Sequence, residues 1–168
     1  MTGEGVARAK RLIGEEKLQI LSKAHVAVFG IGGVGGHAAE ALIRAGIGRL
    51  DFFDGDVVDI TNMNWQIVAL SSTLGRPKAE VMAERAKEIN PDCRAEARIC
   101  FYDEANAGSC PLETYDFIVD AIDTVTSKVL LAKKAQEAGT PLISCMGTGN
   151  KLHPEKLEIA DLYRTSVC

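Results

Sequence analysis

The chain has 168 residues, of which 46% are hydrophobic and 25% are charged, and this is enough apolar material for one folded domain. The formal net charge is −4 and Lys and Arg form no dense run, so a large electrostatic footprint for nucleic acid is excluded, although a local patch for RNA is not. No apolar run approaches membrane-spanning length, and no apolar signal core stands at the N-terminus. We therefore expect a single domain over residues 1–168 in a cytoplasmic protein with no membrane partner.

Along the chain, short apolar runs alternate with segments of helical periodicity. In order, the expected elements are a helix over residues 15–23, a strand over 25–29, a helix over 38–45, a strand over 49–53, a helix that begins at 75–78 and ends at 90–91, strands over 94–99 and 117–122, a helix over 129–138, and strands over 141–144 and 157–161. This alternation predicts right-handed crossovers and a mostly parallel sheet. The expected fold class is α/β, Rossmann-like and doubly wound, with helices on both faces.

Local residue choices mark the ends of these elements. Gly46 suits the left-handed position after a helix, and Pro77 suits a first helical turn. Asn90 precedes a proline and therefore resists helix. Residues 102–114 are the least patterned stretch, and residues 162–168 do not resemble a finished element. We therefore expect the domain to lack a C-terminal portion.

A glycine pattern, Gly30-x-Gly32-x-x-Gly35, follows the strand at 25–29 and opens the next helix. Gly30 permits a tight turn, Gly32 lets a phosphate approach the backbone, and Gly35 allows close contact between helix and strand. The helix N-terminus offers unpaired N–H groups and a partial positive charge to an anion. The pattern, which also includes Gly33, predicts a nucleotide site; ATP, NAD and FAD proteins share it, and a turn without a ligand is the alternative.

Asp54 ends the second strand, where a carboxylate can accept hydrogen bonds from both ribose hydroxyls of a nucleotide. A carboxylate there would repel a 2′-phosphate, so NADP is disfavoured. The alternatives are that Asp54 is a solvated turn residue, or that Asp56 serves in a neighbouring turn.

The polar residues that follow are not expected of a dehydrogenase. They are Asp54, Asp56, Val58, Thr61, Asn62, Asn64 and Gln66, and then Gly75, Pro77 and Lys78. Together with a second acidic signature, Asp120-Ala121-Ile122-Asp123, this pattern resembles the ThiF/MoeB/HesA family, the bacterial relatives of ubiquitin-activating enzymes. The resemblance implies ATP and Mg²⁺ as cofactors and adenylation of a carboxylate as the reaction. A plain NAD oxidoreductase is the alternative from another class.

The resemblance also implies roles for the charged residues. Both reactants of an adenylation are anions, so the site must supply cations and a Mg²⁺ clamp. Lys78 is the candidate that binds the triphosphate, unless it is a solvated helix residue. Asp123 is the candidate that holds Mg²⁺, directly or through water, unless it caps a helix. Lys78 and Asp123 are thus the candidate catalytic residues, and Asp120 is expected to brace the strand end.

The motif departs from the family at Trp65, where the family has an arginine that reaches phosphates across a dimer interface. An indole offers one N–H and no charge. Loss of the arginine's guanidinium group is expected to lower the rate of phosphoryl transfer by orders of magnitude, unless a cation such as Arg76 substitutes. Packing of Trp65 at a subunit interface is another interpretation. In the same motif, Asn62 and Gln66 either orient phosphates or the metal shell, or cap the following turn.

Within the family, the stretches that begin at Arg11, Lys78 and Asp120 look like the dehydratases that cyclise N6-threonylcarbamoyladenosine in tRNA. Residues 146–151 and Asp161 fit the same subgroup. The resemblance implies a tRNA substrate and a homodimer. The first alternative is an activator of a small ubiquitin-like sulfur carrier, against which the missing cysteine pairs of a zinc site argue. The second is a non-catalytic nucleotide-binding module, made inert by Trp65.

The remaining candidates are expected to be structural. The five cysteines form no C-x-x-C pair, so we expect reduced thiols, as in cytosolic proteins. Cys145 is interpreted as a small buried apolar residue rather than a nucleophile. His25 and His37 are interpreted as structural residues, and Lys128 as a lysine on a helix surface rather than in the nucleotide pocket.

Overall fold

The computed structural model describes residues 5–149 and 151–165 and contains a five-stranded sheet with the order β3-β2-β1-β4-β5. The strands are β1 (His25–Phe29), β2 (Arg49–Phe53), β3 (Arg94–Arg98), β4 (Phe117–Asp120) and β5 (Leu142–Ser144). All neighbouring strands are parallel. The predicted Rossmann-like α/β fold is therefore confirmed.

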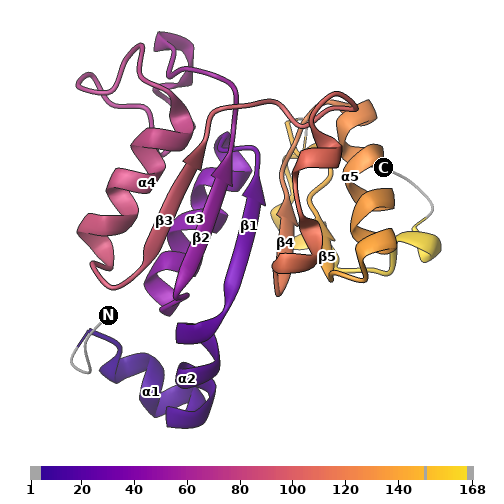
Figure 1. Cartoon of the computed structure of the whole chain (residues 1–168). Coiled ribbons are helices and arrows are strands. Elements are labelled where there is room, and N and C mark those ends of the chain that lie inside the picture. Colours follow the sequence, from indigo (N-terminus) through magenta and orange to yellow (C-terminus); the bar gives the residue numbers. More distant parts are fainter. Residues whose placement is uncertain (1–4, 150, 166–168) are drawn as a thin grey trace.

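Helices lie on both faces of this sheet, as Figure 1 shows. The helices on the faces are α3 (Gly33–Ala45), α4 (Lys78–Ile89) and α5 (Val125–Ala138), whereas α1 (Ala7–Ile13) and α2 (Glu15–Lys23) lie below the sheet in this view. Helices α3 and α4 share one apolar core with β1 and β2, and α5 packs on the opposite face. None of these helices in the described residues is long and apolar enough to cross a membrane.

Both central strands are buried for four residues in succession, because a parallel sheet is covered on its two faces. Alternate residues enter different cores: Val28 packs toward α3 and α4, whereas Phe29 packs toward α5. The rings of Phe29 and Phe53 are stacked with centroids 4.2 Å apart. This packing fixes the carboxyl ends of β1 and β2, where the glycine turn and Asp54 follow.

Several predicted boundaries differ from the structure. Helix α3 begins at Gly33 rather than residue 38, and α5 begins at Val125 rather than residue 129, because the preceding turn residues already adopt helical geometry. Helix α1 has no counterpart among the predicted elements. A glycine with a φ of 83°, Gly14, separates it from α2.

The predicted sixth strand over residues 157–161 is wrong. This stretch is exposed and lies between two short 3₁₀ turns, Pro154–Lys156 and Leu162–Arg164, without a partner strand among the described residues. Its alternation of apolar and polar residues is a strand signal, but a strand needs a free sheet edge beside it. The predicted strands over 94–99 and 117–122 also end earlier, at Arg98 and Asp120.

Candidate nucleotide site

The glycine turn after β1 has the geometry that its sequence predicts. Gly30 has a φ of 87°, and a Cβ at this position would lie 2.6 Å from the carbonyl oxygen of Ala121. A Cβ on Gly35 would overlap the carbonyl oxygen of Gly30, whereas one on Gly32 would meet nothing within 4 Å. The turn is therefore tightly packed on its inner side and open at Gly32.

Helix α3 starts immediately after Gly32, and no side chain among the described residues caps its N-terminus. The first backbone N–H groups of a helix have no intrahelical partner and carry a partial positive charge. The open side of Gly32 gives an anion access to this end of the helix. The turn therefore fits a phosphate group, and it lies at the switch point between β1 and β4, where doubly wound folds bind ligands.

Asp54 ties the end of β2 to this turn. Its carboxylate accepts hydrogen bonds from the backbone N–H groups of Ile31, at 2.6 Å, and Asp56, at 2.8 Å. Burial raises the pKa of Asp54 above its usual value, against the opposing effect of these two N–H groups. Asp54 is thus not a solvated turn residue; its predicted contact with a ribose stays a prediction, and each oxygen keeps a further lone pair for it.

Lys78 is also not a solvated helix residue, because its side chain is only 7% exposed. Its ammonium group donates to Asp56 Oδ2 at 3.1 Å, and its backbone N–H donates to the carbonyl of Asp56 at 3.0 Å. Asp56 is the sole hydrogen-bond acceptor found for this ammonium group in the described part of the chain. Two of its three protons therefore stay available for a ligand.

The polar residues of the segment between β2 and α4 differ from one another in burial and in hydrogen bonding. Asn62 is buried and accepts a hydrogen bond from the backbone N–H of Asp59 at 2.9 Å in a capping box, so its side chain shapes the turn. Gln66 is also buried, but its Oε1 atom has no hydrogen-bond partner within residues 5–149 and 151–165. Asn64 is exposed. A buried amide without a partner is costly, so Gln66 is the better candidate for a ligand contact.

Trp65 packs directly on the glycine turn. A Cβ on Gly33 would lie 2.5 Å from the indole atom Cε3, and the indole Nε1–H donates to the carbonyl of Thr61 at 3.1 Å. The side chain is nevertheless 54% exposed. Because its N–H is already donated, the indole offers no donor to a phosphate in this position.

The second acidic signature separates into a buried and an exposed carboxylate. Asp120 is fully buried and accepts hydrogen bonds from Ser144 at 2.6 Å and from Lys128 at 2.8 Å, so it braces the strand end as expected. Asp123 is exposed, and within the described residues its side chain accepts one hydrogen bond, from Thr124 Oγ1 at 3.4 Å. The prediction that Lys128 lies on the helix surface is wrong, because its side chain is 14% exposed.

The residues that could bind the predicted Mg²⁺ together with Asp123 are few. The described residues contain no group of three His, Cys, Asp or Glu side chains that could hold a metal ion. Mg²⁺ typically keeps several waters and binds one or two carboxylates together with substrate phosphates. A single exposed carboxylate beside a phosphate-sized turn fits that mode of binding.

Cys145 and His37 have surroundings that suit structural residues. Burial raises the pKa of the Cys145 thiol, which disfavours the thiolate that a nucleophile requires. His37 contacts the carbonyl of Gly33 on its own helix at 2.6 Å. Cys168 lies outside the described residues.

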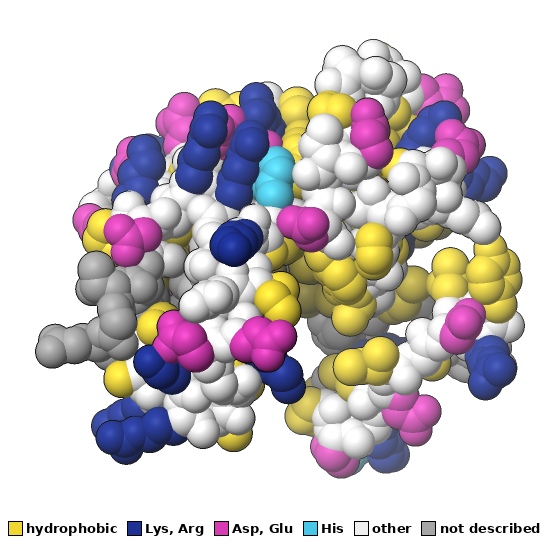
Figure 2. Space-filling view, turned by 60° about the horizontal axis from the view of Figure 1, so that its bottom comes forward, with side chains coloured by type: hydrophobic (Ala, Val, Ile, Leu, Met, Phe, Trp, Pro, Cys, Tyr) yellow, Lys and Arg dark blue, Asp and Glu magenta, His cyan; other side chains and the backbone are white. Residues whose placement is uncertain are grey.

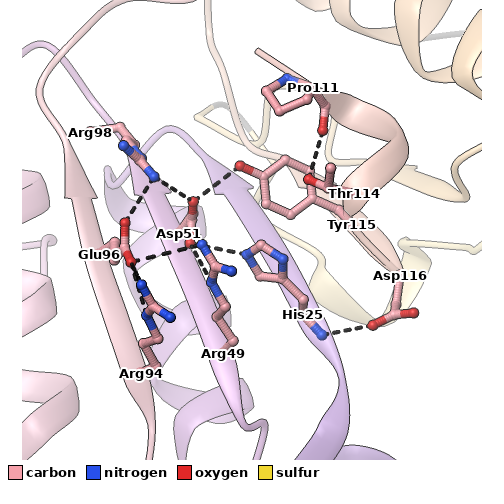
Figure 3. Close-up of polar contacts among 10 residues, drawn as sticks. All are labelled: His25, Arg49, Asp51, Arg94, Glu96, Arg98, Pro111, Thr114, Tyr115 and Asp116. Atoms are coloured by element: carbon pink, nitrogen blue, oxygen red, sulfur yellow. Dashed lines mark hydrogen bonds and ion pairs between the residues drawn. The ribbon is translucent and has the colours of Figure 1, made fainter.

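His25 belongs to a polar network that the sequence did not reveal. Asp51, in the middle of β2, points toward His25, Tyr115 and Arg98 (Figure 3). The three contacts measure 3.0 Å, 3.1 Å and 3.3 Å, respectively. Asp51 is 1% exposed, and burial together with this carboxylate raises the pKa of Tyr115. The network joins β1, β2 and β3, and His25 enters it from the first residue of β1, at the opposite end of that strand from the glycine turn, so His25 has a structural role.

Comparisons with known proteins agree with this geometry. The model of the ThiF family matches residues 6–155. The tRNA threonylcarbamoyladenosine dehydratase of Bacillus subtilis is 44% identical over 159 residues, which are 95% of this chain and 63% of that protein. The sulfur carrier protein adenylyltransferase of Thermus thermophilus is 34% identical over 131 residues, which are 78% of this chain and 48% of that protein.

A solved structure extends the likeness to the fold. The E. coli tRNA N6-threonylcarbamoyladenosine dehydratase in complex with ATP superposes with a TM-score of 0.92 at 40% identity, covering 97% of this chain and 67% of that one. This chain thus spans less than two thirds of the length of the curated relatives it matches.

Proposed function

This chain belongs to the ThiF family, and from that premise we propose that it is the ATP-binding part of an enzyme that adenylates a carboxylate. The observation that carries the proposal is the glycine turn, which is open at Gly32 and leads into the uncapped N-terminus of α3. Lys78 supports it, because a buried ammonium group with two protons to donate suits a triphosphate. The buried Oε1 of Gln66 has no partner among the described residues and is an acceptor, so it suits a hydroxyl or amino group of a nucleotide rather than a phosphate oxygen.

Each residue has a task that follows from its position. The turn and α3 bind phosphate oxygens, Lys78 offsets their charge, and Asp54 is placed to accept from ribose hydroxyls. Asp123 would hold Mg²⁺, which when bound draws charge from the phosphates and orients them. In the reaction, a carboxylate oxygen of the acceptor attacks the α-phosphorus, and pyrophosphate leaves.

We propose N6-threonylcarbamoyladenosine in tRNA as the acceptor, because a dehydratase of that name is 44% identical to this chain. The adenylated carboxyl group is then attacked by the modification's own amide or carbamoyl oxygen, so that a ring closes, AMP leaves and water is lost overall. On the face shown in Figure 2, Lys and Arg side chains are interspersed with Asp and Glu. RNA binding through a broad basic surface is therefore not expected on that face.

The test is pyrophosphate exchange into ATP by the full-length protein. Exchange that requires tRNA carrying the modification supports the dehydratase. Exchange that requires a small ubiquitin-like protein supports the sulfur-carrier activator instead, the activity named for a relative that is 34% identical. An absence of ATP binding would refute both.

A second candidate function is nucleotide binding without turnover. The observation in its favour is that Trp65 supplies no free donor at the turn. The guanidinium of Arg76, the other cation near this position in the sequence, is paired with Glu84 at 2.5 Å. ATP binding without release of AMP, under conditions where a relative turns over, would establish this candidate.

We also propose that the functional unit is a cytoplasmic homodimer. Ile60, Met63 and Trp65, which lie in one loop, are 64%, 39% and 54% exposed, and such side chains suit a protein interface. Light scattering of the full-length protein at micromolar concentration measures the mass directly. A monomer mass together with full activity would contradict the proposal.

A further inference from the structure

Lys128 is the centre of a buried polar cluster that joins three segments. From α5, its ammonium group donates to Asp120 Oδ2 at 2.8 Å, to the carbonyl of Cys145 at 2.9 Å and to Ser144 Oγ at 3.2 Å. Ser144 in turn donates to Asp120 Oδ2 at 2.6 Å. The ends of β4 and β5 are therefore connected to α5 through one side chain.

Lys128 and Lys78 differ in how many of their ammonium protons are already donated within the protein. An ammonium group has three protons, and Lys128 donates to three acceptors within the protein. Lys78 donates to Asp56 alone in the described part of the chain. Lys128 therefore has no proton left for a phosphate, although it lies at the carboxyl edge of the sheet.

The carboxylate that Lys128 holds shapes the turn that carries Asp123. While Oδ2 of Asp120 is held by Lys128, its Oδ1 accepts from the backbone N–H of Ile122 at 3.1 Å. On the other side, the N–H of Ala121 donates to the carbonyl of Phe29 at 2.8 Å, next to the glycine turn. The turn over residues 120–123 is thus fixed between the glycine turn and the Lys128 cluster.

We propose that Lys128 is a positioning residue, which fixes the carboxylate of Asp123 relative to the glycine turn without touching the nucleotide. The inference rests on the proposed function for the ligand that Asp123 serves. Its structural part, that Lys128 holds the turn, can be tested without any ligand. Groups that orient a metal-binding side chain typically change metal affinity by about tenfold to a hundredfold when removed.

The first experiment measures amide hydrogen exchange in the ligand-free protein. Lys128→Met should raise the exchange rate at Ile122 by about tenfold or more, because the carboxylate that accepts this N–H loses its cation. The matched control is Lys134→Met, on the same helix, where the lysine is 43% exposed and pairs with Glu137. Equal exchange at Ile122 in both variants would overturn the proposal. This comparison decides the structural part even if the protein binds no ATP, which would refute the proposed function separately.

The second experiment measures ATP affinity by calorimetry with and without Mg²⁺. Lys128→Met should leave the metal-free affinity within about twofold and lower the gain from Mg²⁺ by about tenfold. A tenfold loss of metal-free affinity would overturn the proposal, because it would make Lys128 a direct ligand of the triphosphate.

A double variant guards against misfolding, since Lys128→Met leaves the buried Asp120 without its cation. Asp120→Asn/Lys128→Met removes both charges and should recover thermal stability while the gain from Mg²⁺ stays low. A wild-type response to Mg²⁺ in the double variant would overturn the proposal, because it would reduce Lys128 to charge compensation.

Discussion

A side chain on Gly35 would overlap the carbonyl oxygen of Gly30, because α3 starts directly against the end of β1. Both sides of this contact are backbone, so neither can move aside cheaply. Gly32, in the same turn, has open space where its side chain would be. We therefore expect Gly35 to be needed for the folding of the turn and Gly32 for the binding of a ligand.

Alanine at these two glycines should have different effects. Gly35→Ala should lower the free energy of unfolding by at least about 2 kcal/mol, because the added methyl group overpacks a rigid contact. Gly32→Ala should change stability by less than about 0.5 kcal/mol, yet weaken ATP binding, because its methyl group occupies the open side. Chemical denaturation and calorimetry measure the two quantities. Equal destabilisation by both substitutions would contradict this assignment.

Lys78→Met should weaken ATP binding by about tenfold or more, because it removes a buried cation from the triphosphate site. Its fold should persist, since the partner Asp56 has a side chain that is 56% exposed and can be solvated. Lys87→Met, an exposed position on the same helix, is the matched control. An unchanged ATP affinity in Lys78→Met would remove this residue from the site.

Trp65 is the only tryptophan in the chain, so its fluorescence reports on the turn without a label. ATP that binds at α3 should change the emission, because the indole packs on Gly33.

Trp65→Arg should raise turnover by about tenfold or more if a cation at this position stabilises the transferred phosphate. The comparison uses AMP release by wild type and variant at saturating ATP. A lower rate in Trp65→Arg would show that the indole itself supports the reaction.

The contact between α3 and α4 should make stability depend on acidic pH. Glu40 pairs with Arg85 at 2.6 Å and with Arg44 at 2.7 Å, and the hydrogen bond from Arg85 holds the pKa of Glu40 below its usual value of 4.5. Because the folded pKa is lower than the unfolded one, this stabilisation is present above pH 4.5 and is lost as the pH falls through the folded pKa.

Glu40→Gln should therefore cost about 1 kcal/mol at pH 7, a difference that shrinks as the pH falls below the unfolded pKa. Thermal melts of both proteins from pH 7 to pH 3 measure this. Glu88→Gln, exposed on α4, serves as the control. A difference that grows toward acidic pH would show the opposite linkage.

The sequence by itself determined the central strands and the glycine turn, and it predicted a nucleotide as the ligand. β1 and β2 were predicted with their observed bounds, because β1 is a mostly apolar run and the two strands stop directly before a glycine and an aspartate. The positive φ of Gly30 and the close contact of Gly35 with Gly30 are local as well, since they follow from a strand that turns at once into a helix. The family motifs added Lys78 and Asp123.

Only the tertiary structure decided which polar residues are free to bind. Lys128 has the sequence context of a surface lysine, yet its partners Ser144 and Cys145 lie at and just after the end of β5, 16 and 17 residues along the chain. Asn62 and Gln66 look alike in the motif, but Asn62 caps a turn, whereas Oε1 of Gln66 has no hydrogen-bond partner among the described residues. The predicted sixth strand over residues 157–161 is wrong, because a strand forms only where it can pair with the edge of a sheet. Local pattern records what a residue prefers, whereas long-range packing sets its hydrogen-bond partners, and those partners leave Lys78 with protons to donate and Lys128 with none.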